Sequence, residues 1–106
     1  MPATSATVAA ATGLISPTGL RELAAAHAVR EAALVHDADA GGWVMVVRTG
    51  LTERVLRMRD AARPRLFATT QSAVAMAHRL GLPRLVVDVA SAPVLPELRR
   101  RYGARA

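Results

Sequence analysis

The sequence predicts a small, single-domain α+β fold in which helices cover one face of an antiparallel sheet. Two stretches have helical spacing and begin at a hydroxyl N-cap, and stretches rich in β-branched residues separate and follow them. The predicted element order is α-β-β-β-α-β. A chain of 106 residues has room for one modest core, so we expect one domain.

The first predicted helix begins at Ser16-Pro17, where a hydroxyl cap precedes a proline at the first helical position. It is expected to end near Ala28. Residues 30–36 alternate only weakly in polarity. They fit either a first strand or a continuation of the helix, and we favour the strand. The residues on the apolar face of this helix are Leu20, Leu23, Ala24 and His27.

The middle of the sequence predicts a β-hairpin. Residues 37–42 have turn composition, with two aspartates and two glycines. Trp43 to Arg48 is the strongest strand in the chain, and Thr49-Gly50 fits a hairpin turn. Thr52 to Arg59 is the predicted return strand, and a polar loop is expected at residues 60–64.

A second helix is predicted after the hairpin. Thr69 is a suitable N-cap, Gly81 ends the helix, and Pro83 prevents it from resuming. Leu85 to Val89 is the last predicted strand. The residues expected to line the buried face of this helix are Ala73, Met76, Ala77 and Leu80.

Both ends of the chain are predicted to lie outside the α+β domain, which we place at residues 16–90. Residues 1–15 are expected to be a disordered leader, because Met1 to Thr12 carry no side-chain charge. A secretory signal needs a positive region before its apolar run, and none is present. No window is long enough to span a bilayer, so we expect a cytoplasmic protein without a membrane partner. Residues 91–106 are expected to form a proline-containing loop and a basic tail.

The chain is basic, with 14 basic residues against 8 acidic ones and a formal net charge of +6. All the basic residues are arginine, which codon usage in a GC-rich genome would also produce. The charge favours acidic partners, either nucleic acid or an acidic protein surface. Only three residues are Phe, Trp or Tyr, and the core is expected to rest on Trp43 and Phe67. Because such a core is small, we expect a homodimer.

Arginines on the hairpin form the leading candidate binding site. Arg57 and Arg59 share one strand parity and are expected to lie on the outer face, roughly 7 Å apart, close to the phosphate repeat of a DNA strand. The alternative is a solvated polar face of a one-sided sheet. Tyr102 beside the tail arginines could stack on a base. The predicted nucleic-acid-binding residues are Arg48, Arg54, Arg57, Arg59, Arg63, Arg65, Arg99, Arg100 and Arg101.

No catalytic or metal-binding motif is present, and we predict that the protein is not an enzyme and has no cofactor. The three histidines, His27, His36 and His78, do not fall at metal-ligand spacing. Asp37 and Asp39 are followed by Ala-Gly-Gly, which fits turn chemistry better than a metal-binding acidic motif. Without lysine or cysteine, neither a phosphate-binding Gly-rich loop ending in Lys-Ser/Thr nor a thiolate zinc site is possible.

Two segments, residues 41–50 and residues 65–89, resemble the ParC-like partition-associated proteins of bacterial plasmids and integrative elements, a family unrelated to the topoisomerase subunit of that name. In that family, a strand ending in Arg-x-Gly precedes a second strand, then Arg-x-Phe-x-Ser-Leu-Asp-Ala-Ala, a helix ending in Leu-Gly, and a strand closing in Val-Asp. Arg65, Phe67, Leu80-Gly81 and Val87-Asp88 match this pattern. Thr69 replaces the serine, while Thr70 and Gln71 depart from the pattern.

The resemblance covers about half of the chain and implies an accessory role in plasmid or element maintenance, alongside a ParA-type ATPase and a DNA-binding ParB-type protein. We therefore expect a protein that binds DNA, or a partition complex on DNA, through its basic surface. Two alternatives remain open. One is a protein-interaction adaptor that docks on an acidic partner without touching DNA, and the other is an antitoxin-like regulator.

Overall fold

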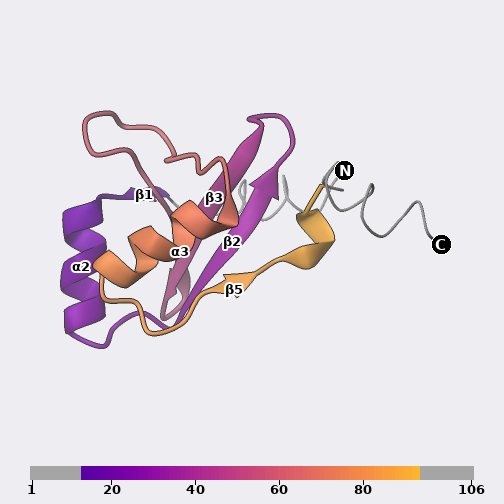
Figure 1. The fold of residues 1–106 in the computed structure, drawn as a ribbon. Coiled ribbons are helices and arrows are strands. Elements are labelled where there is room, and N and C mark those ends of the chain that lie inside the picture. The colour runs from indigo at the N-terminus through magenta and orange to yellow at the C-terminus, as the bar shows by residue number, and fades with distance from the viewer. Residues whose placement is uncertain (1–12, 94–106) are drawn as a thin grey trace.

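The fold is that of a computed structural model, which describes residues 13–93. Two helices and a five-stranded mixed sheet make up this part of the chain, so the predicted α+β class is confirmed. The strands are β1 (Gly13–Ile15), β2 (Glu31–Asp37), β3 (Gly42–Thr49), β4 (Thr52–Leu56) and β5 (Val86–Val87). The helices are α2 (Pro17–Ala25) and α3 (Thr70–Arg79), and a short 3₁₀ helix, η1 (Val89–Ser91), follows β5 (Figure 1). The rest of the predicted leader and the predicted basic tail lie outside the described residues.

The sheet is mixed, so the prediction of an antiparallel sheet is wrong at both edges. The strand order is β1-β4-β3-β2-β5. β3 runs antiparallel to β2 and β4, whereas β1 is parallel to β4 and β5 is parallel to β2. The cause is the pair of helical crossovers. Each helix carries the chain back to the end of the sheet at which the preceding strand began, so the strands before and after it share a direction.

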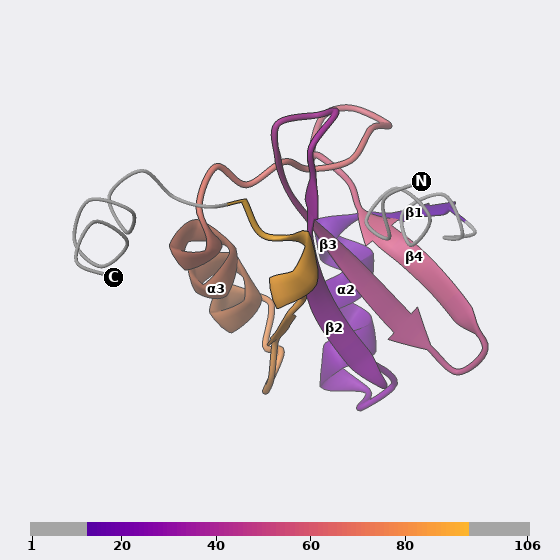
Figure 2. The same ribbon diagram turned by 90° about the vertical axis from the view of Figure 1, so that its right-hand side faces the viewer.

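Both helices pack against the same face of the sheet (Figure 1). Leu20 of α2 and Ala73 and Ala77 of α3 belong to one buried cluster with the side chains of β2, β3 and β4 that point to this face. In Figure 2, β2 and β3 pass in front of α2, with α3 on one side of them and β4 on the other. Trp43 is 8% exposed and Phe67 2% exposed, so their predicted place in the core is confirmed.

The opposite face of the sheet is also apolar, which the sequence analysis did not predict. Val55 has the strand parity expected to point into solvent beside Arg57, yet it is only 2% exposed. This face of the hairpin is therefore built of valines and does not carry a row of arginines. The buried residues on it are Val35, Val44, Val46 and Val55.

β1 lies within the segment that was predicted to be a leader. Ile15 is 6% exposed and belongs to the main core, and its carbonyl accepts a hydrogen bond from the N–H of Arg57 at 2.9 Å. Three residues are too few to show a strand periodicity. The segment was therefore assigned to the leader because it continues an uncharged sequence and shows no strand pattern of its own.

α2 begins at the predicted cap and ends earlier than expected. The Ser16 hydroxyl accepts a hydrogen bond from the N–H of Gly19 at 2.9 Å. At the other end, His27 adopts a φ of 55°, and the N–H of Ala28 donates to the carbonyl of Leu23 at 2.9 Å. This is the bonding pattern of a helix closed by a left-handed residue. His27 is therefore exposed and does not lie on the apolar face, where it had been predicted. The chain then enters β2, so the prediction of a strand for this segment is confirmed at residues 31–36.

β4 ends at Leu56, so Arg57, Met58 and Arg59 do not continue the return strand as predicted. The chain instead folds back on itself beyond Leu56. The N–H of Arg65 donates to the carbonyl of Leu56 at 2.8 Å, and the N–H of Met58 donates to the carbonyl of Arg63 at 2.9 Å. Residues 57–65 therefore form a loop closed on the end of β4.

α3 follows this loop and begins at the predicted cap. The Thr69 hydroxyl accepts a hydrogen bond from the N–H of Ser72 at 3.1 Å, and Gly81 leaves the helix with a φ of 80°. β5 is shorter than predicted, because Asp88 caps η1 by accepting a hydrogen bond from the N–H of Ser91 at 3.3 Å.

We predict that Phe67→Ala destabilises the fold by about 3–5 kcal/mol, because it removes a fully buried aromatic ring from a small core. Leu51 at the tip of the β3–β4 hairpin is fully exposed, so Leu51→Ala is the control and should change stability by less than about 0.5 kcal/mol. Urea denaturation measures both. Equal midpoints for the two variants would show that Phe67 does not anchor the core.

Candidate anion-binding pocket

A surface cavity of about 440 Å³ lies where β1 and β4 end. Its walls come from three places in the chain: the first turn of α2, the loop that follows β4, and the last turn of α3. Ligand sites in sheets with parallel strands are commonly found outside the carboxyl ends of those strands. The residues lining the cavity are Pro17, Thr18, Arg21, Arg59, Arg65, Met76, Arg79 and Leu80. We call this cavity the arginine pocket.

The first wall of the arginine pocket is the N-terminal turn of α2. Ser16 caps the helix directly after β1, which places Thr18 at the cavity and Arg21 one turn further on. A helix N-terminus carries partial positive charge from its unpaired backbone N–H groups. This wall therefore favours anions before the arginine side chains are considered.

The second wall is the loop between β4 and α3, which is fastened to β3. Trp43 and Phe67 exchange two backbone hydrogen bonds, each 2.8 Å long. The Arg65 guanidinium lies 5.2 Å from the centre of the Phe67 ring, a distance suited to a cation–π contact. This contact holds Arg65 at the edge of the core, where it is half-buried, while Arg59 reaches the cavity from the exposed part of the loop.

The third wall is the C-terminal turn of α3, which a single arginine joins to α2. The Arg21 guanidinium donates a hydrogen bond to the carbonyl of Arg79 at 3.5 Å. The carbonyl belongs to the negative end of the helix dipole, so the contact also compensates that end of α3. As a result, the side chains of Arg21 and Arg79 are brought to one cavity from positions far apart in the sequence.

The charge of the pocket is positive without an acidic neighbour in its lining. Four of the eight lining residues are arginines and none is acidic. Among residues 13–93, an ion pair at 3.4 Å joins Arg48 to Glu31, and no ion pair involves the arginines of the pocket. Guanidinium groups present planar sets of N–H donors that match phosphate and carboxylate oxygens. The arrangement is therefore suited to binding an anion.

The structure divides the arginines predicted from the sequence into several groups. Arg59 and Arg65 lie in the pocket, and Arg63 lies on the other side of the loop, where its Nε donates to the Met58 sulfur at 3.2 Å. Arg48 and Arg54 are exposed on the β3–β4 hairpin. The predicted tail residues Arg99, Arg100, Arg101 and Tyr102 lie outside the described residues.

Arg57 has a structural role that the sequence analysis did not foresee. One nitrogen of its guanidinium is placed to donate to three carbonyls of the loop, those of Met58 at 3.0 Å, Arg59 at 3.5 Å and Ala61 at 3.5 Å. The predicted pair of Arg57 and Arg59, side by side on a strand, is therefore absent. One arginine shapes the loop and the other faces the pocket.

Sequence reasoning missed Arg21 and Arg79. Neither residue is among the arginines that the sequence analysis predicted to bind nucleic acid. A signal was available, because a basic residue in the last turn of a helix beside an uncompensated carbonyl end is a common feature of α-helices. That signal could not show that the two helices meet.

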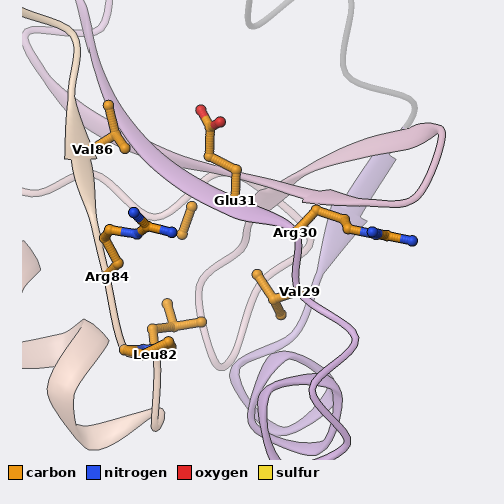
Figure 3. Close-up of a pocket in the computed structure, with 8 residues that line it drawn as sticks. Val29, Arg30, Glu31, Leu82, Arg84 and Val86 are labelled. Atoms are coloured by element: carbon orange, nitrogen blue, oxygen red, sulfur yellow. The ribbon is translucent and has the colours of Figure 1, made fainter.

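A second cavity, of about 250 Å³, lies between the start of β2 and the segment leading to β5 (Figure 3). Its charged lining residues are Arg30, Glu31 and Arg84. Figure 3 shows Arg30 and Glu31 pointing away from Arg84, so the charges do not converge on a common point. Of the cavities described in residues 13–93, the arginine pocket has the most arginines in its lining, four, whereas the cavity beside Arg63 and Arg65 has two.

Scans against protein-family models and searches of curated proteins and solved structures found no match to this chain. Within residues 13–93, no helix is long and apolar enough to cross a membrane, and no group of three His, Cys, Asp or Glu residues is placed to hold a metal ion. The geometry of the arginine pocket is therefore the main guide to function.

We predict that substitutions at Arg57 and Arg59 differ in their effect on stability, although the sequence analysis assigned both residues to the same binding surface. Arg57→Gln should destabilise the protein by about 1–3 kcal/mol, because loop carbonyls lose a charged donor. Arg59→Gln should change stability by less than about 0.5 kcal/mol, because its side chain is exposed. Urea denaturation of both variants measures the difference. A larger loss for Arg59→Gln than for Arg57→Gln would contradict the assigned roles.

Proposed function

We propose that this protein is a non-enzymatic, DNA-binding accessory protein that holds backbone phosphates in the arginine pocket. The observation that carries the proposal is a cavity lined by four arginines and by no acidic residue. Arginine forks bind phosphate oxygens in pairs, and the N-terminus of α2 adds a second favourable element at the same place.

The charge of the whole chain favours a polyanion over a small free anion. A small ligand would need only the pocket, whereas the net charge of +6 acts over the surface at distances up to about 10 Å at moderate salt. Arg54 and Arg63 are exposed arginines outside the pocket, whereas the charge of Arg48 is paired with Glu31. A long run of phosphates could use both the pocket and this surrounding charge.

The biological context of the proposal comes from the resemblance to ParC-like partition-associated proteins. It supports an accessory role in plasmid or mobile-element maintenance, beside a ParA-type ATPase and a ParB-type DNA-binding protein. A small basic protein without a catalytic constellation among its described residues fits such a role. The alternative partner is an acidic protein surface, whose carboxylates would meet the same guanidinium groups.

We predict that Arg59→Ala combined with Arg79→Ala weakens binding to a random-sequence duplex at least tenfold and lowers the slope of log affinity against log salt by about 2. The side chains of both residues are exposed, and among residues 13–93 neither makes a hydrogen bond that supports the fold. Fluorescence anisotropy at several salt concentrations measures affinity and slope together.

The matched control is Arg30→Ala combined with Arg54→Ala, which removes the same charge from two exposed arginines outside the pocket. This control should keep most of the affinity. Equal losses in the two double variants would show that net charge, and not the pocket, governs binding. If the parent protein binds no duplex at low salt and instead binds an acidic protein, the adaptor role replaces the DNA-binding role.

A further inference from the structure

β5 is an apolar strand at the edge of the sheet, and its outer side has no neighbouring strand among the described residues. β5 pairs with β2 on one side and is the last strand in the sheet order. Val86 is 44% exposed, Val87 37% and Val89 77%. An exposed edge strand offers unpaired N–H and C=O groups to another strand, and apolar side chains on it favour such pairing. We call residues 84–88 the β5 edge.

The backbone of the β5 edge shows which residues can accept a further strand. The N–H of Asp88 donates to the carbonyl of Leu34 in β2 at 2.8 Å, so the polar groups of Asp88 and, by alternation, of Val86 face β2. The backbone groups of Leu85 and Val87 therefore point away from the sheet. These two residues would form the hydrogen bonds to an added strand.

We propose that a second copy of this chain occupies the β5 edge, in antiparallel orientation, with Val86 opposite Val86 of the second copy. In this register Leu85 lies opposite Val87 of the second copy, which pairs exactly the residues whose backbone groups point outward. The two copies would then share one continuous sheet, related by a two-fold axis through the Val86 pair.

Charge complementarity selects this register. It places Arg84 of each copy opposite Asp88 of the other, at a position where facing side chains come closest. Among residues 13–93 neither side chain takes part in an ion pair, although Asp88 Oδ1 accepts the hydrogen bond that caps η1. The register with Val87 opposite Val87 would instead place the apolar Val86 opposite Asp88 and leave Arg84 without an acid.

The chain also limits the length of the paired segment. Pro83 has no N–H to donate, so the ladder cannot extend beyond Arg84. The residue that would face it, Val89, begins η1 and no longer has strand geometry. In the proposed register the exposed Val89 side chain would pack against the Pro83 ring of the second copy. This dimer is independent of the DNA-binding proposal.

The first test is sedimentation equilibrium of the full chain at protein concentrations up to about 1 mM, with a charge swap. Arg84→Asp and Asp88→Arg each place like charges opposite one another, and each should weaken dimerisation about tenfold. The double variant, Arg84→Asp with Asp88→Arg, restores opposite charges and should restore the dimer. The control Arg54→Asp makes the same charge change at an exposed arginine on β4, away from β5 in the sheet order, and should leave the dimer intact.

A second variant tests the two-fold axis. Val86→Lys places two like charges against each other and should give a monomer, whereas Val74→Lys, on the exposed side of α3, should remain dimeric. Circular dichroism confirms that each variant is folded. A parent protein that is monomeric at about 1 mM, or a dimer that all of these substitutions leave unchanged, would overturn the proposal.

Discussion

The pair of backbone hydrogen bonds between Trp43 and Phe67 is the constraint on which most of the structure depends. It fastens the loop after β4 to the start of β3, seals the core with two aromatic rings, and sets the position from which α3 begins. The approach is close, since a Cβ atom at Gly42 would lie 3.2 Å from the carbonyl oxygen of Phe67. Glycine at this position lets the two segments meet, and the same contact holds Arg65 against the Phe67 ring.

The two helical crossovers bring the loop that Trp43 and Phe67 hold in place together with both helices, and the arginine pocket lies between them. Because β1 and β4 are parallel neighbours, the segments that leave them emerge at the same end of the sheet. One segment becomes the N-terminus of α2 and the other carries Arg59 and Arg65. The hydrogen bond from Arg21 to the Arg79 carbonyl then closes the third side with the end of α3. The fold concentrates positive charge here, since the four arginines come from three separate segments of the sequence.

The sequence was most informative where the determining interactions are local. The caps at Ser16 and Thr69 and the helix end at Gly81 depend on residues within one turn, and all three were predicted. The strand directions were not predictable, because β1 has only three residues and its pairing with β4 is long-range. Of the arginines that line the pocket, the sequence analysis had named Arg59 and Arg65. Arg57 and Arg59 have the same strand parity in the sequence. Because the loop folds back, Arg57 bonds to loop carbonyls whereas Arg59 lines the pocket.

The most direct test of the account is an NMR titration of the protein with a short DNA duplex, observing backbone amides and arginine Nε groups. The account predicts that the largest shifts occur at Thr18, Arg59, Arg65 and Arg79, and that they decrease as salt is added. Shifts confined to the hairpin arginine Arg54 and its neighbours, with the pocket unchanged at saturation, would contradict the assignment of the arginine pocket as the phosphate-binding site.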